Sequence, residues 1–283
     1  MLLDLLVHLR LPFQLALSAV FLWGVFVTSG QFGPRTLLAW AAFTIGLSGG
    51  ATAFNSYYDR DDGPVGGLRN PPPVSRALLP FSLAVIGLGF LASCLASIRT
   101  GAIYLAAAIL LVAYSHPLVR TKRRPLASTA TVTLASGLLT FLAGAVSGEG
   151  GLSRDALPRV AIGALGASAV VAGFYPLTQL GQVREDRERG DRTFAVAFGR
   201  DAAFRWAVPA LAVAGAINVG LTALVFGWAP AAGLALGLAS LGSIVVRWRR
   251  DPLQDTTARS DLLAYGTAAV HGIVMFARAL SRS

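Results

Sequence analysis

Acidic and amide side chains gather at the end of an apolar run that covers residues 36–58. Asn55, Asp59 and Asp62 are spaced four and three residues apart, so they share one face if the helix continues a turn beyond that run. Converging oxygen ligands suit Mg²⁺, which usually takes one or two carboxylates and completes its shell with water and substrate phosphate. These residues therefore predict half of a magnesium site, and the alternative is a solvated helix end that marks the membrane boundary.

A second polar segment covers residues 175–199. Gln179, Gln182 and Asp186 follow an i, i+3, i+7 pattern that predicts one helix face, and Glu185 lies beside Asp186. An exposed, ion-paired cytoplasmic helix accounts for the outer face of this segment. It does not account for the amides, which extend into an apolar run where unpaired polar groups are costly.

A basic segment lies between the two acidic ones in the sequence. Arg120, Lys122, Arg123 and Arg124 place four cations within five positions. Such a cluster can orient a membrane protein or bind anionic lipid head groups. It also suits a phosphate clamp, because lysine is a compact point charge and arginine a planar fork. Together the three segments predict a site for a diphosphate whose hydrocarbon tail lies in the membrane.

The composition indicates what must position these residues. Hydrophobic residues make up 54% of the 283 positions, charged residues only 13%, and the mean hydropathy is +0.62, which is typical of an integral membrane protein. The net charge of +10 does not indicate nucleic-acid binding, because the basic residues form short blocks between apolar runs. A membrane-spanning helix needs about 20 residues. Nine runs approach that length, at about 11–30, 36–58, 77–98, 101–116, 126–147, 156–181, 203–226, 229–246 and 261–280.

The fold class predicted from these runs is an all-α integral membrane protein, a nine-transmembrane-helix bundle forming one domain over residues 1–283. The linkers after the second, fourth, sixth and eighth runs, together with the first few residues of the runs that follow them, hold 17 of the 24 basic residues, and the alternate linkers, counted in the same way, hold 4. By the positive-inside rule, the first set faces the cytoplasm. We therefore expect a multi-pass protein with a cytoplasmic amino terminus, an outside carboxyl terminus and an active-site cavity that faces the cytoplasm.

The order of "NSYYDRDDG", "YSHPLVRTKRRPL" and "EDRERGDRTFAVAFG", after the second, fourth and sixth runs, resembles the UbiA-type intramembrane prenyltransferase superfamily. The resemblance covers essentially the whole chain. The first family motif reads NDxxDxxxD. Asn55 and Asp59 match it, Ser56 replaces its first aspartate, and Asp62 supplies its last if one residue is missing.

The second family motif, often DxxDxxxD, falls on Gln179, Gln182 and Asp186, of which only the last is an acid. The two amides leave fewer negative charges for a second magnesium ion, and Glu185 is the candidate to compensate. The remaining matches are Tyr114, Ser115 and Lys122 in the basic segment and Gly190, Arg192 and Thr193 after the acidic one.

The resemblance implies Mg²⁺-dependent transfer of an isoprenoid chain from a polyprenyl diphosphate to a lipophilic or aromatic acceptor within the membrane, as in quinone or lipid biosynthesis. The implied catalytic residues are Asp59, Asp186 and Lys122. The implied metal ligands are Asn55, Asp59, Asp62, Gln182, Glu185 and Asp186. The expected substrate contacts are Asn55, Lys122, Arg69, Arg192, Tyr57, Tyr58, Tyr114, Tyr175, Gln179 and Gln182, with the tyrosine rings facing a developing allylic cation.

Two alternatives stay open on the same residues. A terpene cyclase would ionise the same diphosphate and quench the cation within the isoprenoid itself. A non-catalytic membrane protein would bind lipid diphosphates without breaking them. The expected partners are an isoprenoid diphosphate, a hydrophobic or aromatic acceptor and membrane lipid, with no nucleic acid. A transporter is disfavoured, because transporters usually place their polar sites near the membrane midplane.

Overall fold

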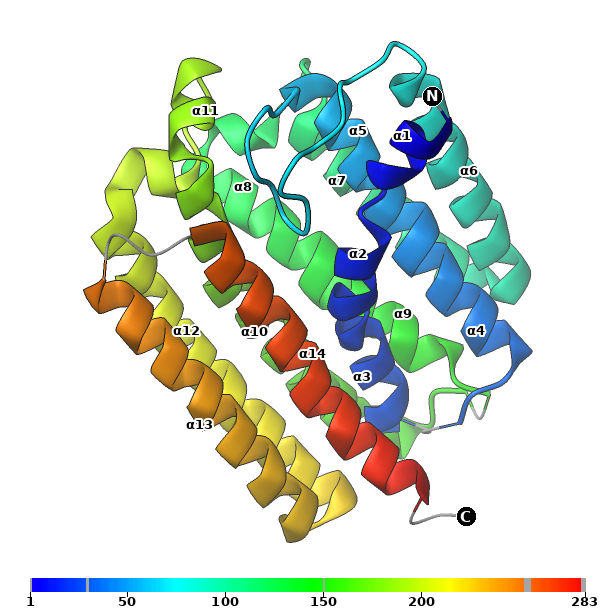
Figure 1. The fold of residues 1–283 in the computed structure, drawn as a ribbon. Helices are drawn as coiled ribbons and strands as arrows, with labels where there is room; N and C mark the ends of the chain where they lie inside the picture. The colour runs from blue at the N-terminus through cyan, green and yellow to red at the C-terminus, as the bar shows by residue number, and fades with distance from the viewer. Residues whose placement is uncertain (1, 29–30, 150, 252–255, 281–283) are drawn as a thin grey trace.

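The chain folds into a bundle of helices that run roughly side by side (Figure 1). The computed structural model describes residues 2–28, 31–149, 151–251 and 256–280. Within these ranges no β-strand is formed, and the only β-type pairing is an isolated bridge between Val65 and Leu68. The all-α prediction is therefore confirmed for this part of the chain.

The first half of the bundle consists of helices that pass back and forth between its two ends. Its elements are α1 (Leu2–Val7), α2 (Leu11–Leu17), α3 (Ala19–Thr28), α4 (Pro34–Ala41), the π-helical η1 (Ala42–Gly49), α5 (Gly50–Asp59), α6 (Leu78–Ala96), α7 (Ile98–Ser115), the 3₁₀ turn η2 (Thr121–Arg123), α8 (Pro125–Val132), the π-helical η3 (Thr133–Leu139) and α9 (Thr140–Ser147).

The second half contains the longest helices. Its elements are the 3₁₀ turn η4 (Arg154–Ala156), α10 (Leu157–Thr178), the 3₁₀ turn η5 (Gln179–Gly181), α11 (Val183–Glu188), α12 (Phe194–Phe226), α13 (Trp228–Arg250) and α14 (Thr256–Leu280). In Figure 1, α14 lies between α13 and the α2–α3 segment, and it packs against both α13 and α2.

Eight helical segments in the described residues are long and apolar enough to cross a membrane. They are Leu2–Thr28, Pro34–Asp59, Leu78–Ala96, Ile98–Ser115, Pro125–Ser147, Arg154–Gly181, Phe194–Phe226 and Trp228–Arg250. Each coincides with one of the first eight predicted runs. The ninth run falls in α14, which has 25 residues, enough length to span, but is not among the eight.

Small residues let neighbouring helices approach closely in the centre of the bundle. A Cβ atom on Gly144 of α9 would overlap the backbone carbonyl oxygen of Phe21 in α3, and one on Gly24 of α3 would overlap that of Phe141 in α9. Contacts at this distance are possible only where glycine replaces a larger side chain. Glycines in the apolar runs therefore serve helix packing.

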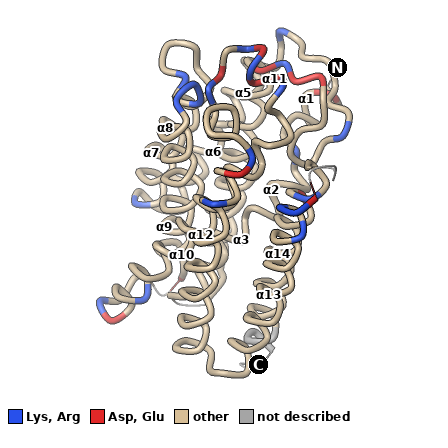
Figure 2. Tube along the Cα trace, turned by 90° about the vertical axis from the view of Figure 1, so that its left-hand side faces the viewer, with Lys and Arg blue, Asp and Glu red and all other residues tan. Residues whose placement is uncertain are grey.

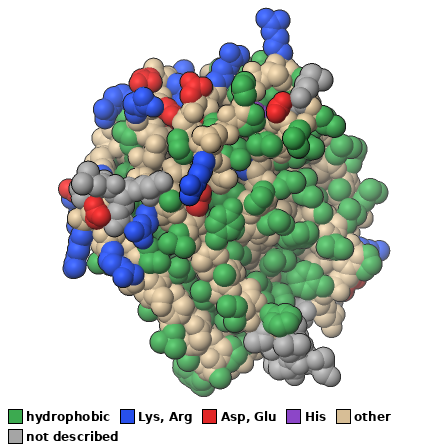
Figure 3. Space-filling model, in the orientation of Figure 1, with side chains coloured by type: hydrophobic (Ala, Val, Ile, Leu, Met, Phe, Trp, Pro, Cys, Tyr) green, Lys and Arg blue, Asp and Glu red, His purple; other side chains and the backbone are tan. Residues whose placement is uncertain are grey.

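Polar and apolar surfaces are separated along the bundle. Figure 2 shows the charged residues gathered mainly at the end where α5 and α11 lie, and Figure 3 shows hydrophobic side chains covering the middle of one face. Many large apolar side chains are exposed, among them Leu88 on α6, Leu224 on α12 and Leu236 on α13. A water-soluble protein would bury most of such a surface, and a lipid bilayer covers it. The fold is that of a multi-pass integral membrane protein.

Candidate active site

Three chain segments far apart in the sequence meet around one lysine at the polar end of the bundle. Asp59 is the last residue of α5, Lys122 belongs to η2 between α7 and α8, and Asp186 belongs to α11. Lys122 Nζ lies 2.6 Å from Asp59 Oδ2, 3.3 Å from Asp191 Oδ2 and 3.8 Å from Asp186 Oδ1. All four side chains are at most 5% exposed. The structure thus brings together the three residues predicted to be catalytic.

Arg120 holds two of these carboxylates from the other side. Its Nε and Nη2 atoms each donate a 2.8 Å hydrogen bond to the carboxylate of Asp191, and Nη2 also donates to Asp59 Oδ1 at 3.0 Å. Its backbone has a φ of 39°, a left-handed conformation that is unfavourable for a residue with a Cβ. Local spacing gave no reason to select Arg120 over its basic neighbours, or to select Asp191 at all, because 71 residues separate the two partners.

A second arginine, Arg189, links the two acidic segments directly. Its Nη1 lies 2.6 Å from Asp61 Oδ1 and its Nη2 lies 2.7 Å from Asp186 Oδ1. Gln182 Nε2 donates a 3.2 Å hydrogen bond to the other oxygen of Asp61. Sequence reasoning identified neither Arg189 nor Asp61 as part of the site.

The prediction that Asn55, Asp59 and Asp62 share one helix face is wrong. Helix α5 ends at Asp59, because Arg60 has a φ of 51° and turns the chain out of the helix. Beyond this turn Asp61 points inward and is buried, whereas Asp62 is exposed. The metal-ligand role predicted for Asp62 therefore falls on a solvent-facing side chain, and Asp61 takes the inward position.

The predicted single helix face through Gln179, Gln182 and Asp186 is also wrong. Helix α10 ends at Thr178, and Gln182, with φ −111° and ψ 9°, interrupts the helix between η5 and α11. Gln179 is buried, and its Oε1 accepts a hydrogen bond from the backbone N–H of Ala195 at 3.2 Å, which ties α10 to the start of α12. Gln182 faces Asp61 instead. The two amides therefore have different structural partners.

Asn55 and Glu185 border the cluster. Asn55 Oδ1 accepts a 2.7 Å hydrogen bond from Ser115 Oγ, which fixes the amide one helical turn before Asp59. The Glu185 side chain is 15% exposed, and its Oε2 atom is buried without a hydrogen-bond partner in the described residues. This oxygen is free to accept a ligand.

The donor set fits a magnesium ion that completes its shell with water and phosphate. Carboxylate oxygens are hard ligands, and among those of the site Glu185 Oε2 is buried without a hydrogen-bond partner in the described residues. Within the described ranges, no three Asp, Glu, His or Cys side chains form a metal cage by themselves. The carboxylates face Lys122, Arg120 and Arg189 instead. A small number of protein ligands is what Mg²⁺ ordinarily takes.

Burial and charge shift the acidic pKa values in opposite directions. Burial raises the pKa of Asp186 above its usual value, and Lys122 and Arg189 offset only part of that effect. Burial also favours the neutral form of Asp191, but the hydrogen bonds from Arg120 and the charge of Lys122 outweigh it and lower the pKa of that carboxyl. Burial raises the pKa of Glu185. Asp191 is therefore the firmly ionised anchor of the cluster.

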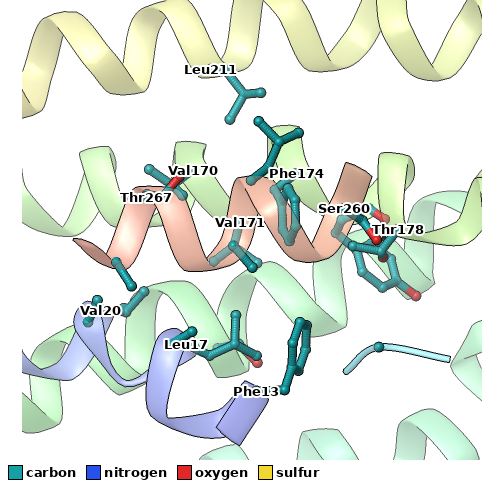
Figure 4. Close-up of a pocket in the computed structure, with 18 of the residues that line it drawn as sticks. Phe13, Leu17, Val20, Val170, Val171, Phe174, Thr178, Leu211, Ser260 and Thr267 are labelled. Atoms are coloured by element: carbon teal, nitrogen blue, oxygen red, sulfur yellow. Dashed lines mark hydrogen bonds between the residues drawn. The ribbon is translucent and has the colours of Figure 1, made fainter. Parts of the chain in front are cut away.

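An apolar cavity of about 790 Å³ lies inside the bundle, next to this cluster. The lining residues nearest the polar cluster include Asn55, Tyr114, Tyr175 and Gln182. The two tyrosine hydroxyl groups are 2.7 Å apart, and Lys122 Nζ lies 5.9 Å from the centre of the Tyr114 ring. Figure 4 shows further wall side chains pointing toward one another from separate helices. They include Phe13, Leu17, Val20, Val171, Phe174 and Leu211.

The expected substrate contacts that do not line this cavity are six: Lys122, Gln179, Tyr57, Tyr58, Arg69 and Arg192. Tyr57 packs beside Leu5 and Leu9, and the Tyr58 ring lies 5.8 Å from that of His116. Neither ring lines the cavity. Arg69 and Arg192 are exposed. The aromatic contacts predicted at Tyr114 and Tyr175 do lie in the cavity wall.

Known proteins with this fold share the same overall arrangement. The chain matches the UbiA prenyltransferase family profile over residues 17–266. A UbiA homologue from Archaeoglobus fulgidus bound to GPP and Mg²⁺ is 19% identical, with a TM-score of 0.71 over 96% of this chain and 99% of that one. An apo UbiA homologue from Aeropyrum pernix K1 is 21% identical, with a TM-score of 0.67 over 98% of each chain.

A structure concerned with the biosynthesis of digeranylgeranylglyceryl phosphate synthase in membranes is 17% identical to the chain. Its TM-score is 0.65 over 99% of both chains. No protein with a curated description matches the chain. The family profile covers most of the sequence, and each structural neighbour covers nearly all of it. The chain belongs to the UbiA prenyltransferase family.

Proposed function

We propose that this protein transfers an isoprenoid chain from a polyprenyl diphosphate to a lipophilic or aromatic acceptor inside the membrane. The observation that carries the proposal is that an apolar cavity of about 790 Å³ lies beside a buried cluster of cations and carboxylates, with Gln182 and Tyr114 between them. A charged diphosphate fits the first environment and its hydrocarbon tail the second. An isoprenoid diphosphate is a molecule that combines the two in this order.

Magnesium supports the proposal, because a related protein of the same fold has been solved with GPP and Mg²⁺ bound. In this chain, Asp59 and Glu185 are the residues that would hold the ion, with Asn55 and Gln182 as further predicted ligands. Of the other predicted ligands, Asp62 is exposed and Asp186 is hydrogen-bonded to Arg189 and Thr193. When bound, the ion neutralises charge on the leaving diphosphate and so lowers the barrier to breaking the allylic carbon–oxygen bond.

The side chains of the site provide the remaining parts of the reaction. Lys122 offers N–H donors to phosphate oxygens, which accumulate negative charge as the carbon–oxygen bond breaks and the electron pair leaves with the diphosphate. Arg120 holds Asp59 and Asp191 in place. The rings of Tyr114 and Tyr175 border the cavity, where their faces stabilise a developing allylic cation. The apolar walls exclude water, which would otherwise capture that cation before the acceptor does.

The topology is part of the same proposal. We infer a single domain over residues 1–283 with nine membrane helices, α14 being the ninth, a cytoplasmic amino terminus and an outside carboxyl terminus. The strongly basic loops around η2 and α11 support a cytoplasmic site. A single-cysteine series is practical because Cys94 is the only cysteine. In intact cells, Arg187→Cys should react with an impermeant maleimide only after the membrane is permeabilised.

Pyrophosphate release tests the activity. Purified protein in lipid nanodiscs would receive geranyl diphosphate and Mg²⁺, with and without a membrane-lipid extract as the acceptor source. A transferase releases pyrophosphate only with acceptor, a cyclase releases it without acceptor, and a binding protein releases none. Asp59→Ala and Asp186→Ala should each abolish release, whereas Arg187→Ala, an exposed change on α11, should not. Unchanged turnover in both aspartate variants would refute the proposed function.

A further inference from the structure

Arg189 lies where the two acidic segments of the site come closest together. One terminal nitrogen bonds Asp61, at the end of the first segment, and the other bonds Asp186 in the second. The same Nη1 also donates to the backbone carbonyl of Asp59 at 3.3 Å. A single guanidinium group therefore bridges the carboxylates of both segments with short, charge-assisted hydrogen bonds.

Both bridged carboxylates have their second oxygen covered as well. Asp61 Oδ2 accepts from Gln182 Nε2 at 3.2 Å, and Asp186 Oδ2 accepts from Thr193 Oγ1 at 3.1 Å. A divalent ion between Asp61 and Asp186 would have to displace Arg189 from both. Glu185 Oε2 has no hydrogen-bond partner in the described residues, and Asp59 is held by Lys122 and Arg120 rather than by Arg189. Both therefore lie outside this bridge and would hold one metal ion.

We propose that Arg189 is a fixed cation that takes the place of a second divalent ion, so that the site binds one Mg²⁺ rather than two. The inference rests on the proposed function, because it concerns the metal requirement of that same site. An arginine side chain stays protonated at any working pH, so the bridge is permanently charged. Gln182 donates to Asp61 and Gln179 accepts from the backbone N–H of Ala195, so neither position supplies a carboxylate to a second ion.

The chemistry of a fixed cation differs from that of a metal bridge. Arg189 neutralises the two acidic segments before any diphosphate arrives, and its Nε atom is buried with no hydrogen-bond partner in the described residues. That nitrogen lies 3.6 Å from Asp191 Oδ2, so the guanidinium also faces a third carboxylate. The protein should therefore show a first-order dependence on Mg²⁺ rather than the cooperative dependence of a two-ion site.

Manganese binding in nanodiscs tests the proposal without relying on turnover. Mn²⁺ would be titrated by calorimetry in the presence of inorganic pyrophosphate, and electron paramagnetic resonance would report whether bound ions are magnetically coupled. We expect one uncoupled Mn²⁺ in the wild type and a coupled pair in Arg189→Ala, with the second ion binding at least about tenfold more tightly than in the wild type. Arg187→Ala, on the exposed side of α11, should keep one ion.

Arg189→Lys provides the conservative variant, since it keeps a charge but loses the fork, and it should also bind one ion. Thermal unfolding checks that each variant is folded. Two coupled ions in the wild type, or a single ion in folded Arg189→Ala, would overturn the role of Arg189 and leave the proposed function standing. Absence of bound Mn²⁺ from every folded variant would overturn the magnesium-dependent function itself. The two failures are therefore distinguishable.

Discussion

Replacement of Asp191 by asparagine should destabilise the protein far more than the same replacement at Asp186. Asp191 is fully buried and accepts two 2.8 Å hydrogen bonds from Arg120, with Lys122 Nζ at 3.3 Å. An amide at this position removes the charge and turns an N–H₂ group toward the donors of Arg120. Breaking a buried pair in this way costs about 3–5 kcal/mol, because Arg120 loses the carboxylate that accepts two of its hydrogen bonds and keeps only Asp59 as a counter-charge.

Replacement of Asp186 by asparagine should leave the free energy of unfolding unchanged or raise it slightly. Burial raises its pKa, which means that the folded protein disfavours the ionised form despite Lys122 and Arg189. An amide removes that burial penalty and still accepts a hydrogen bond from Thr193 Oγ1. We expect the free energy of unfolding of Asp186→Asn to lie within about 1 kcal/mol of the wild type.

Thermal unfolding in detergent, followed by the fluorescence of the five tryptophans, measures the difference. At about 2–3 °C per kcal/mol for a chain of this size, Asp191→Asn should lower Tm by about 6–15 °C. Asp186→Asn should leave Tm unchanged or slightly higher. Equal losses for the two variants, or a larger loss for Asp186→Asn, would refute the assignment of Asp191 as the ionised anchor.

The pH dependence gives a second test of the same reasoning. The folded-state pKa of Asp191 is below its usual 3.8, so the stabilisation from this carboxylate is fully present above 3.8 and is lost as the pH falls through the lower, folded value. The Tm gap between the wild type and Asp191→Asn should therefore stay constant from pH 7 to about 4 and narrow only below that. A gap that closes between pH 7 and pH 5 would contradict the sign of the shift.

Three further outcomes follow from the site and the packing. Lys122→Met should lower pyrophosphate release by at least about 100-fold while leaving Mn²⁺ binding in place, because the cation assists the leaving group and is not a metal ligand; loss of Mn²⁺ binding in the folded variant would contradict this role. Val171→Trp should shorten the longest isoprenoid diphosphate accepted, as judged by product mass, because Val171 lines the cavity; an unchanged product length would argue that the tail lies elsewhere. Gly144→Ala should cost about 2–3 kcal/mol by forcing α9 away from Phe21, whereas Gly87→Ala, with nothing within 4 Å of the added carbon, should not lower Tm.

Membrane insertion and the approximate helix boundaries followed from the sequence alone. The length of an apolar run is set by bilayer thickness, and a helix satisfies its backbone hydrogen bonds without help from distant residues. Each of the first eight predicted runs accordingly coincides with a spanning segment. The same local logic placed Asp59, Lys122 and Asp186 at helix ends, since charges cannot lie deep in an apolar run without partners.

Helix ends were the point where prediction from spacing failed. The faces predicted through Asp62 and through Gln179 assumed uninterrupted helices, yet Arg60 and Gln182 leave the helical conformation. Whether a helix continues past its apolar run depends on contacts that the local sequence does not contain. Arg60 ends α5, and the turn directs Asp61 rather than Asp62 toward Arg189.

The ion-pair pattern was decided by tertiary structure alone. Sequence determined that acidic and basic residues would meet at one membrane face, because their signs and positions in alternate linkers require it. It did not determine that Arg120 would bind Asp191 or that Arg189 would bridge Asp61 and Asp186, because the Arg120–Asp191 and Arg189–Asp61 contacts join residues 71 and 128 positions apart. Only the packing of the helices that carry these residues brings such charges within 3 Å, and burial then makes each pairing strong enough to define the site.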